Sequence, residues 1–186
     1  MGRLVYSMMV SLDGFVAGPN GEIVGAVDEE VHRFANQEAQ KSRTEFYGRR
    51  MYETMVYWET ADERTDTPDH EREFSRIWKG LDKVVFSSTL NEVSSARTRI
   101  EREVKPDEIR KLKAASDKDL SVAGPALASR FIKERLVDEY AFYVTPVIVG
   151  GGTPLFMDVG RRIDLELVEQ HGFANGVVFL RYTEHQ

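Results

Sequence analysis

The sequence contains no cysteine in its 186 residues, which excludes disulfide bonds, cysteine-ligated zinc sites and catalytic thiols. It also has no apolar run long enough to cross a membrane. The N-terminal stretch lacks a long apolar region followed by a small-residue cleavage site, and Tyr6 stands where a myristoylation signal requires serine or threonine. We therefore expect a cytoplasmic protein that has no membrane partner.

An excess of positive charge is missing as well. The chain has 25 lysines and arginines against 31 acidic residues, which gives a net charge of −6. Because nucleic-acid-binding surfaces are usually basic, we expect no nucleic-acid partner, although a local basic pocket for a phosphorylated ligand is compatible with this balance. The length and a hydrophobic content of 41% predict one domain that spans residues 1–186.

Three motifs of large enzyme classes are absent. The first predicted strand is not followed by G-x-G-x-x-G, and neither a P-loop nor a G-x-S-x-G elbow occurs. These absences disfavour a standard Rossmann oxidoreductase, a P-loop enzyme and an α/β-hydrolase. The four histidines show no paired metal-ligand spacing, and the acidic residues of segment 66–71 are more typical of a solvated loop, so we expect no metal.

Apolar, β-prone segments alternate with helical patterns along most of the chain. The expected strands are 4–10, 44–47, 83–87, 97–100, 120–123, 138–149, 164–170 and 176–183. The expected helices are 28–40, 49–57, 68–78, 106–115 and 125–135. The alternation predicts an α/β domain with a mostly parallel sheet and an antiparallel C-terminal edge. Pro146 indicates a bulge or an edge within the expected strand 138–149.

The stretch FYGRRMYETM, residues 46–55, ends an apolar segment at Gly48 and continues through Arg49 and Arg50 into a helical pattern. Glycine allows a sharp turn or a close approach to a ligand, and the first turn of a helix attracts phosphate through its N–H groups. Arginine adds a planar set of donors. Taken alone, the stretch fits an ordinary strand-to-helix turn with two solvated arginines better.

Two other expected strand ends carry small or hydroxyl-bearing residues, at 87–89 and 123–126. Because ligands of such sheets bind beyond the carboxyl ends of the strands, these segments and 48–50 together predict a site for a phosphate-rich cofactor. A fourth segment, GGGT at 150–153, fits a turn or bulge slightly better than a close backbone approach to a ligand.

Five stretches, in this order and spacing, resemble the dihydrofolate reductase superfamily over nearly the whole chain. They are MVSLDGFVAG, FYGRRMYETM, KVVFSSTL, SVAGPALASRFI and DEYAFYVTPVIVGGGTPLF. The chain is most similar to the bacterial branch related to the reductase domain of the bifunctional riboflavin-biosynthesis deaminase/reductase. The resemblance implies a dihydrofolate reductase-like three-layer sandwich with a mostly parallel central sheet and an antiparallel C-terminal strand. It also implies NADPH as cofactor, hydride transfer and a homodimer.

The resemblance further implies which residues contact the cofactor. The implied residues are Met8, Met9 and Val16 beside the nicotinamide, Gly48, Arg49, Arg50 and Met51 near the phosphates, Ser87 and Ser88 near the adenosine, and Ala123, Gly124, Pro125 and Ala126 under the pyrophosphate. The chain departs from the family pattern at Met51, usually a threonine, and at Ala123, usually the first glycine of a pair often joined by a cis peptide. Ala126 replaces an arginine found near the 2′-phosphate in some relatives, so NADH is not excluded.

The resemblance also directs attention to an acid for the proton that accompanies hydride transfer. A carboxylic acid with a raised pKa can guide that proton and bind an aminopyrimidine edge. Glu30 stands four residues before Phe34, so both lie on one helical face, and Asp13 lies in the loop that borders the substrate. A surface position for Glu30 fits the sequence equally well. Asp28 fits a helix N-cap, and His32 fits a surface or satisfied position.

The leading hypothesis is an NADPH-dependent reductase that acts on a small pyrimidine- or pteridine-like heterocycle. We prefer the 5-amino-6-(5-phosphoribosylamino)uracil type of substrate over dihydrofolate. The alternative is a non-catalytic, dimeric nucleotide-binding protein on the same scaffold. A hydrolase ranks last because Ser87 and Ser88 have no predicted histidine partner. The charged segment 59–73 is either a lid or a solvated loop.

Overall fold

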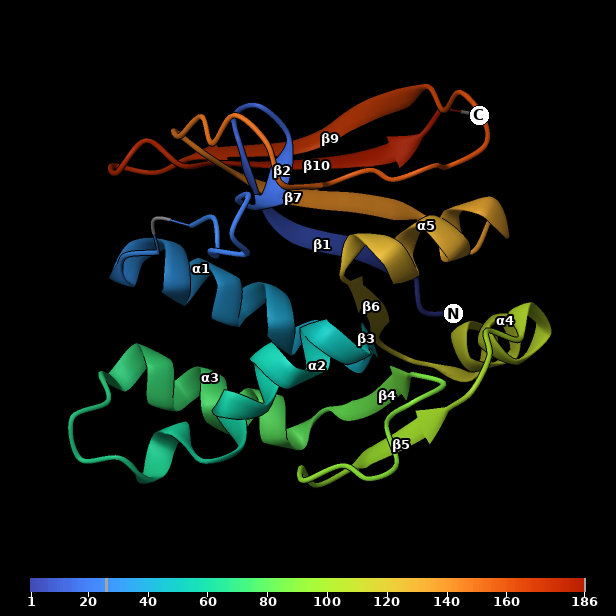
Figure 1. The fold of residues 1–186 in the computed structure, drawn as a ribbon, viewed down its shortest axis with the longest axis horizontal. Coiled ribbons are helices and arrows are strands. Elements are labelled where there is room, and N and C mark those ends of the chain that lie inside the picture. Colours follow the sequence, from blue (N-terminus) through green and yellow to red (C-terminus); the bar gives the residue numbers. More distant parts are fainter. Residues whose placement is uncertain (26, 186) are drawn as a thin grey trace.

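The computed structural model describes residues 1–25 and 27–185 and is built on an eight-stranded sheet in the order β5-β4-β3-β6-β1-β7-β10-β9 (Figure 1). Its strands are β1 (Leu4–Ser11), β3 (Ser42–Gly48), β4 (Asp82–Phe86), β5 (Thr98–Glu101), β6 (Asp119–Ala123), β7 (Glu139–Thr145), β9 (Leu165–Gly172) and β10 (Val178–Glu184). The pairs from β5 through β7 are parallel, whereas β10 runs antiparallel to both β7 and β9. The predicted mostly parallel sheet with an antiparallel C-terminal edge is thereby confirmed.

Helices cover both faces of this sheet. They are α1 (Glu29–Gln40), α2 (Arg49–Met55), α3 (Asp69–Gly80), α4 (Pro106–Ala115) and α5 (Pro125–Lys133), with the 3₁₀ turns η1 (Val56–Glu59) and η2 (Ala61–Glu63). Figure 1 shows α1, α2 and α3 gathered on one side of the sheet and α4 with α5 on the other. Tyr6 packs with Phe131 of α5, whereas Val5 packs with Val31 of α1, because alternate strand residues point to opposite faces. The result is the predicted three-layer sandwich.

Local signals in the sequence explain where the helices start. Asp28 caps α1 by accepting a hydrogen bond from the Val31 amide at 3.0 Å, as predicted. Pro106 and Pro125 occupy the first positions of α4 and α5, where a missing N–H costs nothing. None of the helices in the described part of the chain has the length and apolar character needed to cross a bilayer.

Three sequence expectations need correction. The strand predicted at 138–149 ends at Thr145, because Pro146 has no N–H to continue the ladder. The helix predicted at 49–57 breaks at Met55 into α2 and the turn η1. A small antiparallel pair, β2 (Phe15–Ala17) with β8 (Thr153–Pro154), was not predicted, since two or three residues leave no periodic pattern. The peptide bonds of the described residues include no cis bond.

Candidate functional site

The three segments predicted to hold phosphate lie side by side at one edge of the sheet. β3 lies between β4 and β6, so Gly48 pairs in register with Phe86, and Tyr47 with Ala123. The Arg49 guanidinium donates to the Thr89 hydroxyl at 3.0 Å, which joins the ends of β3 and β4. The carboxyl ends of three parallel strands therefore bring segments 48–51, 87–89 and 123–126 together.

The start of α5 offers backbone donors at this edge. Gly124 precedes the helix with a φ of +96°, a conformation that strains any residue with a side chain. A side-chain carbon at Gly124 would also lie 3.5 Å from the Cβ of Met51. No described side chain caps α5, which leaves the first-turn amides of Ala126 and Leu127 to bind an outside acceptor.

The hydroxyl of Ser87 stabilises the turn after β4. It accepts hydrogen bonds from the amides of Thr89 at 3.2 Å and Leu90 at 2.9 Å, and Ser87 is buried, whereas Ser88 is exposed. Arg102 donates to the carbonyls of Ser87 at 2.8 Å and Leu90 at 2.6 Å. Sequence reasoning missed Arg102, because it comes from the segment after β5 and has no motif around it.

The C-terminal half of β1 borders the same site. Although β1 lies between β6 and β7, Ser7, Met8 and Met9 are only half-buried, so the helices do not fully cover the middle of this strand. Met8 reaches the cofactor segments, because its sulfur accepts the Gly124 amide at 3.2 Å. Val16, in contrast, is buried in the main core cluster, where it packs against this end of the sheet.

Asp13 holds two loops together. Its carboxylate accepts the amides of Gly150 at 2.8 Å and Val149 at 3.2 Å. A hydrogen bond with Ser11, followed by those loop amides, lowers the pKa of Asp13. Asp13 is exposed, so its predicted contact with a substrate stays a prediction alongside these contacts to the loop at Val149 and Gly150. At Gly152 of that loop a side-chain carbon would lie 2.1 Å from the Ala17 carbonyl, so the close approach is to another backbone segment.

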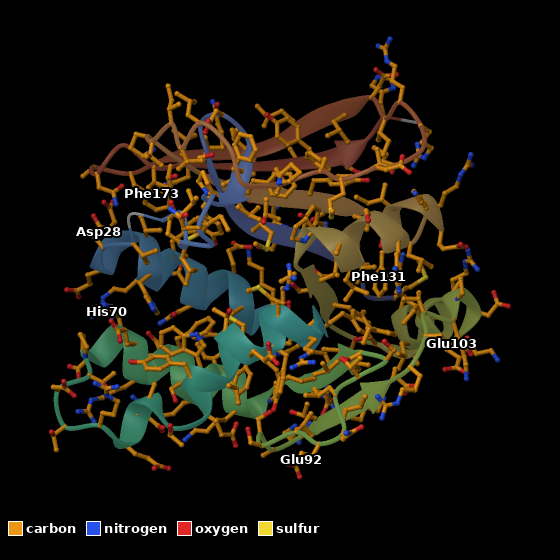
Figure 2. The ribbon with its side chains drawn as sticks, in the orientation of Figure 1. Asp28, His70, Glu92, Glu103, Phe131 and Phe173 are labelled. Atoms are coloured by element: carbon orange, nitrogen blue, oxygen red, sulfur yellow. The ribbon has the colours of Figure 1, made fainter. Side chains whose placement is uncertain are left out.

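Glu30 lies at the surface, which is one of the two positions that the sequence allows for it, and not in an apolar pocket. It is exposed, and its Oε2 accepts the Ala174 amide of the β9–β10 hairpin at 3.2 Å. Phe34 packs toward the sheet, stacked on His171 with 5.2 Å between ring centroids. The β9–β10 hairpin contacts both residues, but the Glu30 side chain stays at the surface, whereas Phe34 packs among the rings of His171, Phe173 and Phe179. Figure 2 shows Asp28 and Phe173 of that hairpin at the same end of the molecule.

His32 is half-buried between α1 and α3. Its ring contacts Trp58, His70 and Phe74 with centroid separations from 5.0 to 5.7 Å, and its Nδ1 is 3.1 Å from the Asn36 side-chain oxygen. Burial, with a smaller effect of His70, lowers the pKa of His32, so the ring is neutral at pH 7. Within residues 1–25 and 27–185, no group of three or more histidine, aspartate or glutamate side chains is arranged to hold a metal ion.

Known proteins match this chain over nearly its full length. The profile of the RibD C-terminal domain family matches residues 3–179. The uncharacterized protein YyaP of Bacillus subtilis (strain 168) is 35% identical over 184 residues, which cover 97% of this chain and 94% of YyaP.

Solved structures share the fold at low sequence identity. A candidate riboflavin biosynthesis protein from Shewanella sp. PV-4 superposes with a TM-score of 0.73 at 20% identity, with 99% of each chain covered. A diaminohydroxyphosphoribosylaminopyrimidine deaminase/5-amino-6-(5-phosphoribosylamino)uracil reductase of Thermotoga maritima gives 0.65 at 14% identity, with 99% of this chain but 57% of the larger protein covered. The chain therefore belongs to the RibD C-terminal domain family, and its fold is that of a RibD reductase domain.

Proposed function

We propose that this protein is a cytoplasmic, NADPH-dependent reductase that transfers hydride to a pyrimidine- or pteridine-like heterocycle. The observation that carries the proposal is the meeting of segments 48–51, 87–89 and 123–126 beyond three adjacent parallel strands. The half-buried middle of β1 lies beside them through the contact of Met8 with Gly124, so a ligand held by those segments lies next to apolar side chains of β1. Membership in a family of reductase domains supports the same reaction class.

The residues at this edge fit NADPH. Arg49 and Arg50 supply positive charge, and the amides of Ala126 and Leu127 supply donors for phosphate oxygens. When bound, the nicotinamide supplies the hydride, and the protein supplies orientation. Met8 would form an apolar wall beside the ring, because its thioether adapts to irregular shapes. Within this class the resemblance favours a phosphoribosylaminopyrimidine, as named for the Thermotoga maritima structure, over dihydrofolate, and the uncharged counterparts of both compounds belong to the same class.

Replacing both Arg49 and Arg50 with alanine is expected to weaken NADPH binding by about tenfold or more, because charge-assisted hydrogen bonds to phosphate are lost. NADH binding should fall less, since NADH carries no 2′-phosphate. Fluorescence titration of both dinucleotides measures this. The control is Arg162→Ala, which removes an exposed arginine just before β9, at the opposite edge of the sheet. Unchanged NADPH affinity in the double variant, or no binding of either dinucleotide at millimolar concentration, contradicts the proposal.

The exposure of Glu30 is the observation that favours the alternative, a nucleotide-binding protein without catalysis. A turnover assay with the dinucleotide-loaded protein distinguishes the two functions. A reductase lowers the absorbance of NADPH when pterins, folates or aminopyrimidine ribosides are added. A protein that binds NADPH and leaves it reduced with every member of the panel fits the alternative.

A homodimer, which the resemblance implies, draws support from the outer strand β9. This strand is an unpaired sheet edge, and it exposes Leu165, Leu167 and Val168. We expect Leu167→Lys to shift the mass in solution from twice 21.2 kDa to 21.2 kDa. Light scattering after size-exclusion chromatography measures the mass, with Ile23→Lys as a control in a loop far from β9 along the chain. A monomeric wild-type protein contradicts the expectation.

A further inference from the structure

The lysines and arginines are distributed unevenly around the edge of the sheet where the strands β1, β7, β3, β4 and β6 end. Residues 4–32, 136–160 and 163–180 contain no lysine or arginine. These stretches supply the loops after β1 and β7, the start of α1 and the β9–β10 hairpin. The cofactor half of the edge, by contrast, carries Arg49 and Arg50 at the start of α2. The two halves therefore differ in the charge that they present to a ligand.

Hydrogen bonds hold the cation-free segments together as one surface. The Asp13 carboxylate bonds to the Gly150 amide, and the Glu30 carboxylate bonds to the Ala174 amide. Gly25, just before α1, lies close to the Met9 sulfur of β1. We call this surface the mouth, and define it as residues 11–25, 27–32, 146–153 and 173–176. It adjoins the half-buried middle of β1, and we take it as the surface that a substrate crosses to reach a ring held beside Met8.

Each acidic side chain of the mouth already has a partner within the protein. The pairs are Asp13 with the Gly150 amide at 2.8 Å, Glu22 with the Asn20 amide at 2.9 Å, Asp28 with the Val31 amide at 3.0 Å, Glu29 with the Arg33 side chain at 2.7 Å, and Glu30 with the Ala174 amide at 3.2 Å. No unpartnered carboxylate among them calls for a cationic ligand. The start of α1 would otherwise attract an anion, but carboxylates at Asp28, Glu29 and Glu30 occupy it.

Apolar side chains make up much of the remaining surface of the mouth. Five of them are exposed to between 41% and 75%, namely Leu12, Ile23, Val27, Val147 and Ile148. Exposed apolar groups gathered around an opening are typical of a binding surface. Such a surface packs against an uncharged ring and offers nothing that replaces the hydration of a phosphate or carboxylate.

We infer that the substrate of this protein is an uncharged heterocycle that carries neither phosphate nor carboxylate. The inference rests on the proposed reductase function and narrows its substrate class. Arginine, lysine and unoccupied helix N-termini are the common phosphate-binding groups, and the described residues of the mouth include no lysine or arginine and only a helix N-terminus that carboxylates occupy. A 5′-phosphorylated riboside and a folate glutamate would each place a negative charge beside the carboxylates of α1. The dephosphorylated riboside or a simple pterin avoids that repulsion.

A matched pair of ligands tests the inference. Calorimetry on the NADP⁺-saturated protein compares 5-amino-6-ribosylaminouracil with its 5′-phosphate, and the ratio of their kcat/KM values with NADPH gives a second readout. We expect the 5′-phosphate to bind at least about tenfold more weakly and to be reduced less efficiently. A separate NADPH titration tests the proposed function. If NADPH fails to bind while the uncharged riboside is still preferred, the reductase proposal fails and the specificity of the mouth stands.

A second test of the inference adds a cation to the mouth. Ile148→Lys changes a residue that is 72% exposed, and should shift the ratio of the two affinities about tenfold toward the 5′-phosphate. Met157→Lys, in the segment after β8 and 43% exposed, adds the same charge outside the mouth and should have no such effect. Equal or tighter binding of the 5′-phosphate by the wild type overturns the inference. Failure of both ligands to bind, or an equal response to the two lysine variants, also overturns it.

Discussion

Replacing Arg181 with alanine is expected to lower the free energy of unfolding by about 3–5 kcal/mol, because the change removes the buried cation of an ion-pair network and leaves the buried Glu139 carboxylate with Arg3 alone. The Arg181 side chain is 8% exposed and lies among Glu38, Glu139 and Glu169. Its Nη1 is 2.8 Å from Glu139, whose own side chain is 5% exposed, and its Nε is 3.2 Å from Glu169. Glu139 thus loses a charge-assisted partner in a place that water barely reaches.

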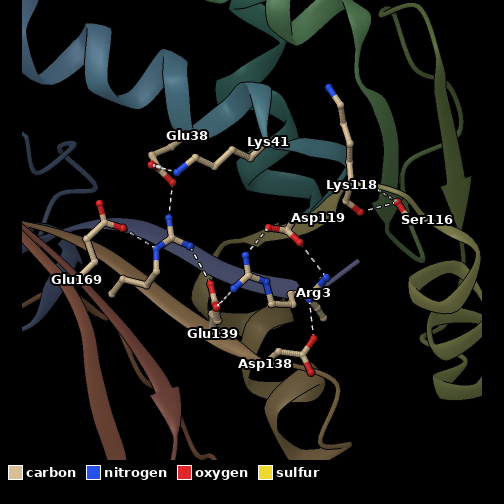
Figure 3. Close-up of polar contacts among 11 residues, drawn as sticks. Arg3, Glu38, Lys41, Ser116, Lys118, Asp119, Asp138, Glu139 and Glu169 are labelled. Atoms are coloured by element: carbon tan, nitrogen blue, oxygen red, sulfur yellow. Dashed lines mark hydrogen bonds and ion pairs between the residues drawn. The ribbon is translucent and has the colours of Figure 1, made fainter. Parts of the chain in front are cut away.

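The network extends to the start of β1, where Arg3 bonds to both Glu139 and Asp119 (Figure 3). Arg3, Asp119 and Glu139 lie at the starts of β1, β6 and β7, opposite the candidate site. The Arg181 variant should therefore be less stable while binding NADPH normally below its unfolding transition. Arg181→Lys should fall between the wild type and the alanine variant, since a single ammonium cannot reproduce the fork of a guanidinium.

Urea denaturation measures the loss, and Arg162→Ala provides the matched control. Arg162 pairs with Asp164 at 2.7 Å, but the two side chains are 86% and 66% exposed. Exposed pairs contribute little, so this variant should stay within about 0.5 kcal/mol of the wild type. An Arg181→Ala variant that loses less than about 1 kcal/mol would show that the buried carboxylates are protonated or rehydrated in the folded protein.

The parts of the fold that depend on local periodicity were predictable from the sequence. The apolar run at 44–47 became β3, and the pattern opened by Pro68 became α3. The meeting of segments 48–51, 87–89 and 123–126 was predictable for a different reason. In a parallel sheet the carboxyl ends of neighbouring strands lie at one edge, so the residues after those strands become neighbours without any motif that links them.

The contacts that depend on packing between distant segments were not predictable. The spacing of Glu30 and Phe34 correctly placed both on α1, but their surroundings depend on how the β9–β10 hairpin covers the helix. Likewise, nothing near Asp13 indicates that its carboxylate bonds to the loop at Val149 and Gly150, more than 130 residues away. The spacing of two residues determines whether they lie on the same face of a helix. Which segment packs against that face depends on the whole fold.

The buried residues Glu45 and Lys83 escaped sequence reasoning for the same reason, and they give the protein a distinct dependence on pH. They pair in register on β3 and β4. Burial raises the pKa of Glu45 to about 7, against contributions from Ser121 and Lys83 that lower it. Burial lowers the pKa of Lys83 to about 8, and the Lys83 ammonium donates to the carbonyls of Trp78 at 3.0 Å and Leu81 at 2.9 Å.

The directions of these two pKa shifts determine the pH at which the folded protein is least stable. Between pH 4.5 and about 7 the folded protein keeps a proton on Glu45 that the unfolded chain releases, so stability falls as pH rises through this window. Between about pH 8 and 10.5 the unfolded chain binds the proton on Lys83 more tightly, so stability rises again. The two groups together place a minimum of stability between pH 7 and 8.

Glu45→Gln should remove the fall in stability that the wild type shows between pH 4.5 and about 7. The shift from 4.5 to about 7 corresponds to about 3 kcal/mol, so the variant should be more stable than the wild type by up to that amount at pH 7.5 and nearly equal to it at pH 4.5. Urea unfolding at steps from pH 4.5 to 10 measures both arms, with the exposed Glu166→Gln on β9 as the control that leaves the profile unchanged. A wild-type stability that stays flat from pH 4.5 to 7 would mean that the carboxylate of Glu45 reaches water in the folded state, because only a desolvated acid holds its proton in that range.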